Sequence, residues 1–197
     1  MRLFTPALLL TLLVGGHPCL GQWRAVASVT IRSCALADSL LGPISEKGAV
    51  TAGYKRGSDS ILLYSHGALS RSLTMFAMLE RERAPAPFPA PSLNFVIGAP
   101  AAAVSLFNSA PPDLTLVLDD TLRLHLGIAL LGRYRGPQEL TAAPLTSLLM
   151  PAWALSVARA KKATLLVDAA TFDVSPQNLR DYRAFYRVAV CDTLPAY

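Results

Sequence analysis

The residues best suited to chemistry are two adjacent carboxylates, Asp119 and Asp120, followed closely by His125. They lie in the segment LTLVLDDTLRLHL at 114–126. A carboxylate pair can act as general acid and base when burial or a neighbouring acidic cluster separates the two pKa values. No second acidic cluster adjoins this pair in the sequence, so the pattern of the surrounding leucines decides its interpretation.

The leucines of this segment occupy even positions, which predicts that they share one face of a β-hairpin. A three-residue corner at 119–121 would pair 118 with 122, 116 with 124 and 114 with 126, and so keep every leucine on one side. A two-residue turn would mix the faces, and one unbroken strand would be unusually long. Aspartate suits such corners because it accepts backbone hydrogen bonds and tolerates a left-handed backbone. We therefore predict that Asp119 and Asp120 are turn residues and that His125 is exposed.

A secreted hydrolase is the alternative function that these residues leave open. It would combine a serine, a histidine and an aspartate, drawn from Ser65 or Ser70, His66 or His125, and Asp119 or Asp120. The chain has no G-x-S-x-G nucleophile elbow, P-loop, Rossmann glycine fingerprint or H-E-x-x-H motif. We therefore expect no catalytic residues, no metal ligands and no bound cofactor.

The C-terminal segment carries the remaining functional candidates. Ser175 and Pro176 are typical of a helix start, and apolar residues follow at helical spacing as far as Val190. The residues of a possible interaction surface on this helix are Tyr182, Arg183, Tyr186 and Arg187. Tyrosine and arginine are enriched at protein interfaces. The alternative is that the helix buries its aromatic residues against a sheet.

Alternation of apolar and polar residues predicts short strands elsewhere in the chain. The expected strands lie at 23–31, 49–54, 60–65, 72–79, 93–98 and 102–107. The close spacing of the first strands favours an antiparallel meander. Residues 80–91, ERERAPAPFPAP, are expected to form a charged, Pro-rich surface loop. Residues 145–153 have helical spacing, and 155–168 are interpreted as a hairpin around 160–162, with an amphipathic helix as the rival.

The first residues have the layout of a secretory signal peptide. Arg2 gives a positive start, and an apolar run at 6–16, too short to span a bilayer comfortably, precedes small residues near Gly21. We expect cleavage after Gly21 and a mature chain that starts at Gln22, without a transmembrane segment. Cys19 suggests a lipoprotein, but His17 and Pro18 are not the small residues that such a site requires before its cysteine.

After removal of residues 1–21, the cysteines that remain are Cys34 and Cys191. In an oxidising compartment, two cysteines most simply form one disulfide that closes nearly the whole mature chain. Two free thiols are the alternative. The formal net charge of +5 is distributed over several short basic clusters, which is typical of a solvated surface. Nucleic-acid binding would need one coherent basic face, so we do not expect it.

The order of several features resembles the invasion-associated locus B proteins. The resemblance consists of an exported leader, an early Trp23 and Cys34, the stretches VIGAPAAAVSLFN and LTLVLDD, a short LTSLL, and the final SPQNLRDYRAFYRVAV. It spans much of the mature chain, whereas the segment HGALSRSLTMFAMLERERAPAPFPAP departs from it. Members of that family are exported bacterial β-sandwich proteins. The resemblance implies a β-sandwich and an envelope location, and it transfers no catalytic residues.

Together these features predict a mainly β protein. We expect a single-domain antiparallel β-sandwich over residues 22–197 with one or two short α-helices, including the C-terminal one. The expected function is that of an exported, noncatalytic binding or structural module in the cell envelope or outside the cell. Its partner would be another envelope or extracellular protein, and the sequence leaves the oligomeric state open.

Overall fold

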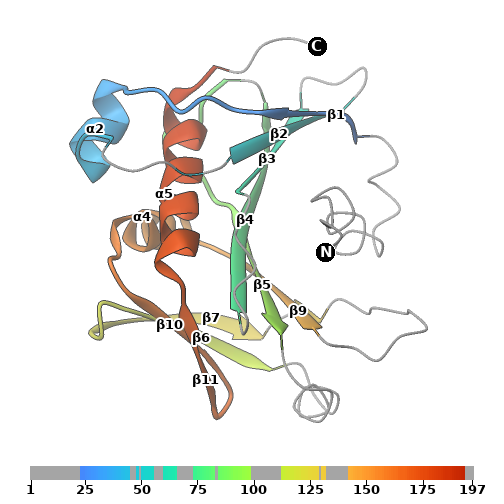
Figure 1. The fold of residues 1–197 in the computed structure, drawn as a ribbon, viewed down its shortest axis with the longest axis vertical. Helices are drawn as coiled ribbons and strands as arrows, with labels where there is room; N and C mark the ends of the chain where they lie inside the picture. Colours follow the sequence, from blue (N-terminus) through green and yellow to red (C-terminus); the bar gives the residue numbers. More distant parts are fainter. Residues whose placement is uncertain are drawn as a thin grey trace, which may run out of the picture.

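The protein folds into two antiparallel β-sheets and a group of helices, as seen in a computed structural model (Figure 1). The structure describes residues 23–44, 48, 50–55, 60–65, 73–82, 84–98, 112–128, 130–131 and 142–193. The signal peptide expected at 1–21 and the strand expected at 102–107 lie outside the described residues. Strands dominate the described part, which confirms the predicted mainly β fold class.

The larger sheet has seven strands in the order β1-β2-β3-β4-β5-β9-β8. Their bounds are β1 (Trp23–Ser28), β2 (Val50–Lys55), β3 (Ser60–Ser65), β4 (Leu73–Glu82), β5 (Ser92–Gly98), β8 (Leu130–Leu131) and β9 (Ala142–Leu148). The first five strands pair in chain order, each antiparallel to the next, which confirms the predicted meander. β9 then adds to the free edge of β5.

The smaller sheet has four strands in the order β11-β10-β6-β7. Their bounds are β6 (Asp113–Leu118), β7 (Leu122–Ile128), β10 (Ala163–Val167) and β11 (Ala170–Val174). Both of its hairpins bury one face, because fully buried residues alternate with less buried ones along β6 and along β10.

Three helices occur in the described part: α2 (Ala35–Leu41), α4 (Pro151–Arg159) and α5 (Pro176–Cys191). α4 and α5 each begin with proline, whose fixed φ suits the first helical turn. The Ser175 side chain accepts a hydrogen bond from the backbone N–H of Asn178, as expected of an N-cap. The Cys34 side chain caps α2 in the same way, accepting from Ala37. α2 was not expected from the sequence, because its seven residues carry too few turns for a clear helical period.

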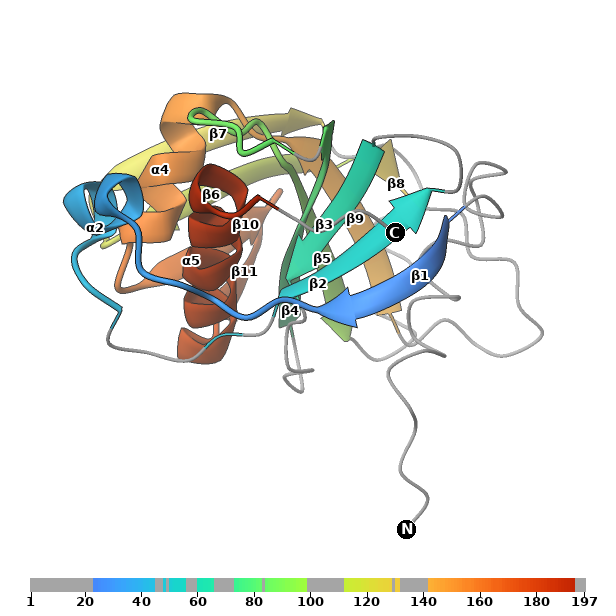
Figure 2. The same ribbon diagram turned by 90° about the horizontal axis from the view of Figure 1, so that it is seen from above.

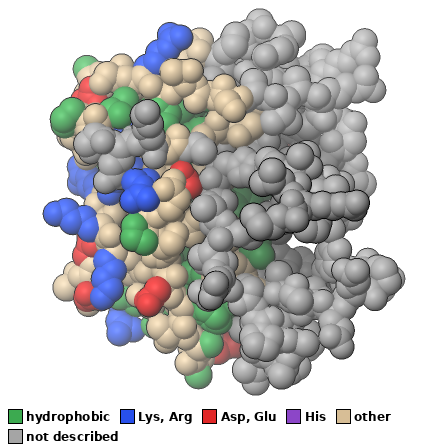
Figure 3. Space-filling view, in the orientation of Figure 1, with side chains coloured by type: hydrophobic (Ala, Val, Ile, Leu, Met, Phe, Trp, Pro, Cys, Tyr) green, Lys and Arg blue, Asp and Glu red, His purple; other side chains and the backbone are tan. Residues whose placement is uncertain are grey.

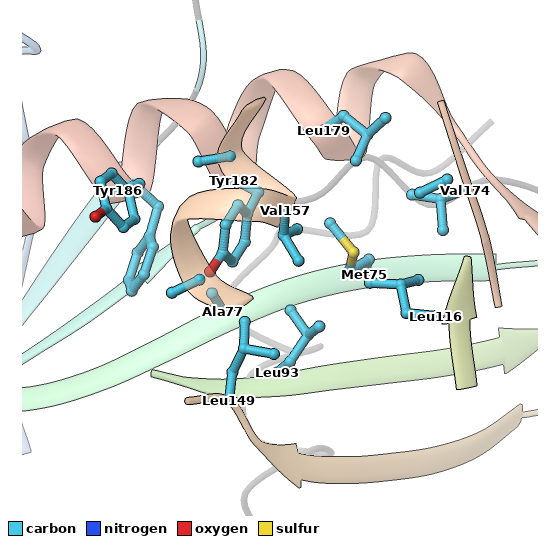
Figure 4. Close-up of a cluster of buried hydrophobic side chains, with 14 of the residues drawn as sticks. Met75, Ala77, Leu93, Leu116, Leu149, Val157, Val174, Leu179, Tyr182 and Tyr186 are labelled. Atoms are coloured by element: carbon cyan, nitrogen blue, oxygen red, sulfur yellow. The ribbon is translucent and has the colours of Figure 1, made fainter. Parts of the chain in front are cut away.

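The helices and the smaller sheet cover the same face of the larger sheet, and together they form the second layer of the sandwich (Figure 2). α5 lies across β2, β3 and β4, while β11 contacts β4 and β7 contacts β9. Figure 4 shows side chains of α4 and α5 meeting those of β4 and β5 in one cluster, with Leu116 of β6 beside them. Phe95, Tyr182 and Phe185 are fully buried in this core.

The leucine hairpin has the predicted corner and nearly the predicted register. Leu118 pairs with Leu122 and Leu116 pairs with Leu124, as expected for a three-residue turn at 119–121. A bulge then shifts the register, so Leu114 pairs with Gly127 instead of residue 126. Gly127 has a φ of 78°, a left-handed value that glycine adopts without steric cost. The expected pairing of 114 with 126 is therefore wrong.

Three local predictions differ from the structure. Residues 142–148 form β9 and the helix begins only at Pro151, because the sheet edge of β5 overrides the helical spacing of the leucines. Residues 160–162 connect α4 to β10, so they are not the corner of a hairpin. Residues 80–82 continue strand β4, and the surface loop starts after them. That loop is attached to α5 by the Ala86 N–H, which donates to the Ala189 carbonyl.

Cys34 and Cys191 lie at disulfide distance. Their Cα atoms are 6.0 Å apart, within the usual range for a disulfide, and the structure joins their sulfur atoms. Cys34 directly precedes α2 and Cys191 is the last residue of α5. The pair therefore connects the two ends of the described chain, across a sequence separation of 157 residues.

Candidate functional site

The carboxylate pair occupies an exposed turn. Asp119 and Asp120 have left-handed φ values of 49° and 60°. The Asp119 carboxylate accepts hydrogen bonds from the backbone N–H groups of Lys161 and Lys162, both at 2.9 Å. The Asp120 carboxylate is 2.8 Å from the Lys162 ammonium, and this contact raises the pKa of Lys162. The pair therefore fixes the connection between α4 and β10, and the prediction that these are turn residues is confirmed.

The residues of a hydrolytic triad are not brought together in the described part of the chain. The His125 side chain is 68% exposed, and its Nδ1 is 3.6 Å from Oδ1 of Asp113. Ser65 is buried in β3, where its hydroxyl accepts a hydrogen bond from the Ala77 N–H. His66 and Ser70 lie outside the described residues. Among described residues, no group of three or more His, Cys, Asp or Glu side chains could hold a metal ion.

The aromatic residues of α5 face the core. Tyr182 and Tyr186 are at most 1% exposed, and burial raises the pKa of both hydroxyls, that of Tyr182 well above its ordinary value. The positive charge of Arg159 opposes the shift in the pKa of Tyr186. Tyr182 and Tyr186 are therefore unavailable as an exposed interaction surface.

The arginines proposed for the same surface connect helices to one another. Arg183 donates from Nε to the Ala158 carbonyl at 2.8 Å and from Nη2 to the Ala160 carbonyl at 3.1 Å. Arg187 is only 4% exposed; it donates to the Asp38 carboxylate at 2.8 Å and to the Gly42 carbonyl. Arg183 thus connects the C-terminal end of α4 to α5. Arg187 connects α2 to α5.

These attachments leave a cleft of about 390 Å³ between α2, α4 and the first half of α5. Its described lining consists of Leu40 and Leu41 from α2, Arg159 from α4, Ala160 and Lys161 from the following turn, and Pro176, Leu179, Arg180 and Arg183 from α5. Four of these side chains are cationic and none is acidic. We call this cleft the basic cleft. A smaller hollow of about 30 Å³ shares Leu41, Arg180 and Arg183 with it.

Two cations of the basic cleft, Arg159 and Arg180, donate hydrogen bonds to neutral groups in the described structure. Arg159 donates from Nε to the Leu40 carbonyl at 2.9 Å. Arg180 donates to Oε1 of Gln177 from Nε at 3.2 Å and from Nη2 at 2.6 Å. The Lys161 ammonium has no hydrogen bond or ion pair within the described residues. Neutral acceptors orient a guanidinium without cancelling its charge, so Arg159 and Arg180 bring their positive charges to the cleft.

In the surface view, Lys and Arg side chains lie along the left edge of the molecule beside and below α4, with Asp and Glu side chains among them (Figure 3). Arginine side chains and the N-terminal end of α5 both favour an anion at such a place. The described lining contains no serine, cysteine, histidine or carboxylate that could serve as nucleophile or base. The arrangement is suited to holding an anion.

Sequence reasoning placed these cations on a solvated surface as separate clusters, RAKK and RDYR. The structure brings them together because α4 packs on α5. One signal was present: Arg180, Arg183 and Arg187 recur at steps of three and four, which puts them on one side of the helix. The contribution of Arg159 and Lys161 depends on tertiary packing, which no local pattern encodes.

The comparisons with known proteins supply no relative. No family model matches the chain, and the searches of curated proteins and of solved structures found no match. In the described part of the structure, no helix has the length and apolar character needed to cross a membrane. The functional proposal therefore depends on the residues of this chain.

Proposed function

We propose that the protein is an exported, noncatalytic binding module of the cell envelope or the extracellular space, and that its binding site is the basic cleft. The observation that carries this proposal is the gathering of Arg159, Lys161 and Arg180 around one cleft without an acid in its described lining. Small-molecule sites are usually concave and combine apolar walls with a few convergent polar groups.

Export is supported by the cysteine pair. Disulfides persist in oxidising compartments and are rare in the cytosol. Cys34 and Cys191 lie at the ends of α2 and α5, two of the three helices around the cleft. A disulfide there would fix the α2 wall of the site in an extracytoplasmic setting. The apolar leader at 6–16 and the resemblance to the invasion-associated locus B proteins support the same location.

Fractionation of cells that express the full chain tests the export proposal. We expect the protein in the periplasmic or extracellular fraction, with a mature N-terminus near Gln22. Mass spectrometry after alkylation without reductant should find Cys34 and Cys191 linked. An uncleaved cytoplasmic protein with three alkylatable thiols, those of Cys19, Cys34 and Cys191, would contradict the proposal.

An assay of ester and amide hydrolysis tests the noncatalytic part. We expect no turnover by the purified chain. Turnover that is lost in the variant His125→Ala would contradict the proposal, since His125 is the described histidine with a carboxylate neighbour.

A further inference from the structure

We propose that the basic cleft binds a phosphate group carried by a small, partly apolar molecule. This inference rests on the proposed binding function and names the chemistry of the ligand. Three cations carry it: Arg159 at the end of α4, Lys161 in the turn that follows, and Arg180 on α5. They come from separate elements and line the same space.

The number of positive charges favours phosphate over carboxylate. A carboxylate has a single negative charge and is satisfied by one bidentate arginine. A phosphate monoester carries about −1.5 to −2 charges near neutral pH and offers three acceptor oxygens. Within the described residues, none of these three cations is paired with a carboxylate. Several cations without a carboxylate partner among the described residues match a dianion better than a monoanion.

The two arginines are oriented before a ligand arrives. Arg159 uses its Nε on the Leu40 carbonyl, and Arg180 uses Nε and Nη2 on the Gln177 amide oxygen. A guanidinium has five N–H donors, so other donors remain for a phosphate oxygen. Fixing these side chains in advance lowers the entropy cost of binding. Lys161 is exposed and can close on the phosphate as a flexible third cation.

The apolar walls define the rest of the ligand. Leu40, Leu41 and Leu179 line the cleft beside the cations, and Pro176 places the first turn of α5 there as well. A volume of about 390 Å³ falls in the range of small-molecule sites. A compact ring or short acyl group would fill this apolar part. A long polyanion would instead need an extended basic track.

Calorimetric titration of the oxidised full chain with phenyl phosphate tests the inference. The cleft variants are Lys161→Gln and Arg180→Gln. Their matched controls are Lys162→Gln, the adjacent lysine that pairs with Asp120, and Arg123→Gln, an exposed arginine of β7 outside the cleft lining. Circular dichroism checks that each variant retains the fold.

We expect saturable binding that each cleft variant weakens about five- to tenfold, because each removes a charge-assisted contact. The control variants should bind like the parent chain, and added salt should weaken binding. Benzoate should bind more weakly than phenyl phosphate. Absence of saturable binding, equal binding of benzoate, or equal weakening by the control variants would overturn the inference.

Two further probes identify the source of the phosphate. Vesicles of phosphatidylcholine with phosphatidic acid test a lipid headgroup, and inorganic phosphate tests a free anion. Vesicle binding that needs Lys161 and Arg180 assigns a lipid source; binding of soluble phosphates alone assigns a soluble ester. Failure of every probe with an exported, disulfide-linked protein would refute this inference and leave the proposed export intact. A cytoplasmic protein that still binds phenyl phosphate would refute the proposed export and leave the inference about phosphate intact.

Discussion

At the scale of single residues, α5 shows that position decides what a tyrosine or an arginine does. Tyr182 fills the core, where its hydroxyl is buried without a hydrogen-bond partner in the described structure. Arg187 is equally removed from solvent but is satisfied by Asp38 and the Gly42 carbonyl. A buried polar group costs free energy unless it is paired. The hydroxyl of Tyr182 is therefore a local source of instability.

The variant Tyr182→Phe should be more stable than the parent chain. Removing an unpaired buried hydroxyl should raise the free energy of unfolding by about 1 kcal/mol at neutral pH. Burial also raises the pKa of Tyr182, so the folded phenol stays neutral at alkaline pH where the unfolded phenol ionises. The parent chain should thus lose stability as pH rises past the ordinary tyrosine pKa, and the variant should lose less.

Urea unfolding at neutral and alkaline pH measures both effects. Tyr186→Phe is the comparison, because the Tyr186 hydroxyl, unlike that of Tyr182, is not among the buried described atoms without a hydrogen-bond partner, so its removal should yield a smaller gain. A destabilised Tyr182→Phe variant would show that the hydroxyl has a stabilising role.

At the scale of elements, the turn at 119–121 lies outside the basic cleft but holds the backbone of one residue that lines it. Asp119 holds the backbone of Lys161 and Lys162, and Lys161 lines the cleft. The hairpin that was clearest in the sequence therefore supports the site indirectly. The leucines at even positions predicted the corner and two of the three leucine pairs, because alternation along a strand indicates directly which face is buried.

Comparing the variants Asp119→Ala and Asp120→Ala distinguishes the effect of the Asp119 hydrogen bonds on stability from the effect of backbone strain. Both positions are left-handed, so alanine strains the backbone in both. Only Asp119 also accepts two backbone hydrogen bonds from the α4–β10 connection. We expect Asp119→Ala to be less stable than Asp120→Ala by about 1 kcal/mol. Thermal unfolding of both variants measures the difference, and equal midpoints would contradict the role assigned to Asp119.

Element boundaries were harder to predict where two periodicities compete. Residues 145–153 combine leucines at helical spacing with a length that also suits a strand. The open edge of β5 selects the strand, and Pro151 then starts the helix instead of ending one. Such a choice depends on a neighbour that is distant in the sequence, so local spacing cannot make it.

At the scale of the whole molecule, the sequence predicted the layers better than the site. Alternation predicted individual strands, the close spacing of the first strands predicted an antiparallel meander, and the cysteine count predicted the contact between Cys34 and Cys191. The basic cleft was missed because α2, α4 and α5 form it jointly, and α2 itself was not expected. A site assembled from three elements can be recognised only after their packing is known.

The double variant Cys34→Ser, Cys191→Ser should affect the whole molecule and the cleft together. Serine keeps an oxygen at the N-cap of α2, where Cys34 now accepts from Ala37, so local capping is preserved. The cross-link spans a sequence separation of 157 residues, and its loss should lower the free energy of unfolding by up to about 5 kcal/mol on loop-entropy grounds.

The same variant should bind phenyl phosphate more weakly, since α2 forms one wall of the cleft. Arg187 still holds α2 through Asp38, so the loss of affinity should be partial. Urea unfolding and calorimetry on oxidised parent, reduced parent and double variant measure the two effects. If the cross-link acts as argued, the reduced parent and the double variant will behave alike. An unchanged unfolding midpoint in both would show that the helices and the two sheets hold the ends of the chain together without it.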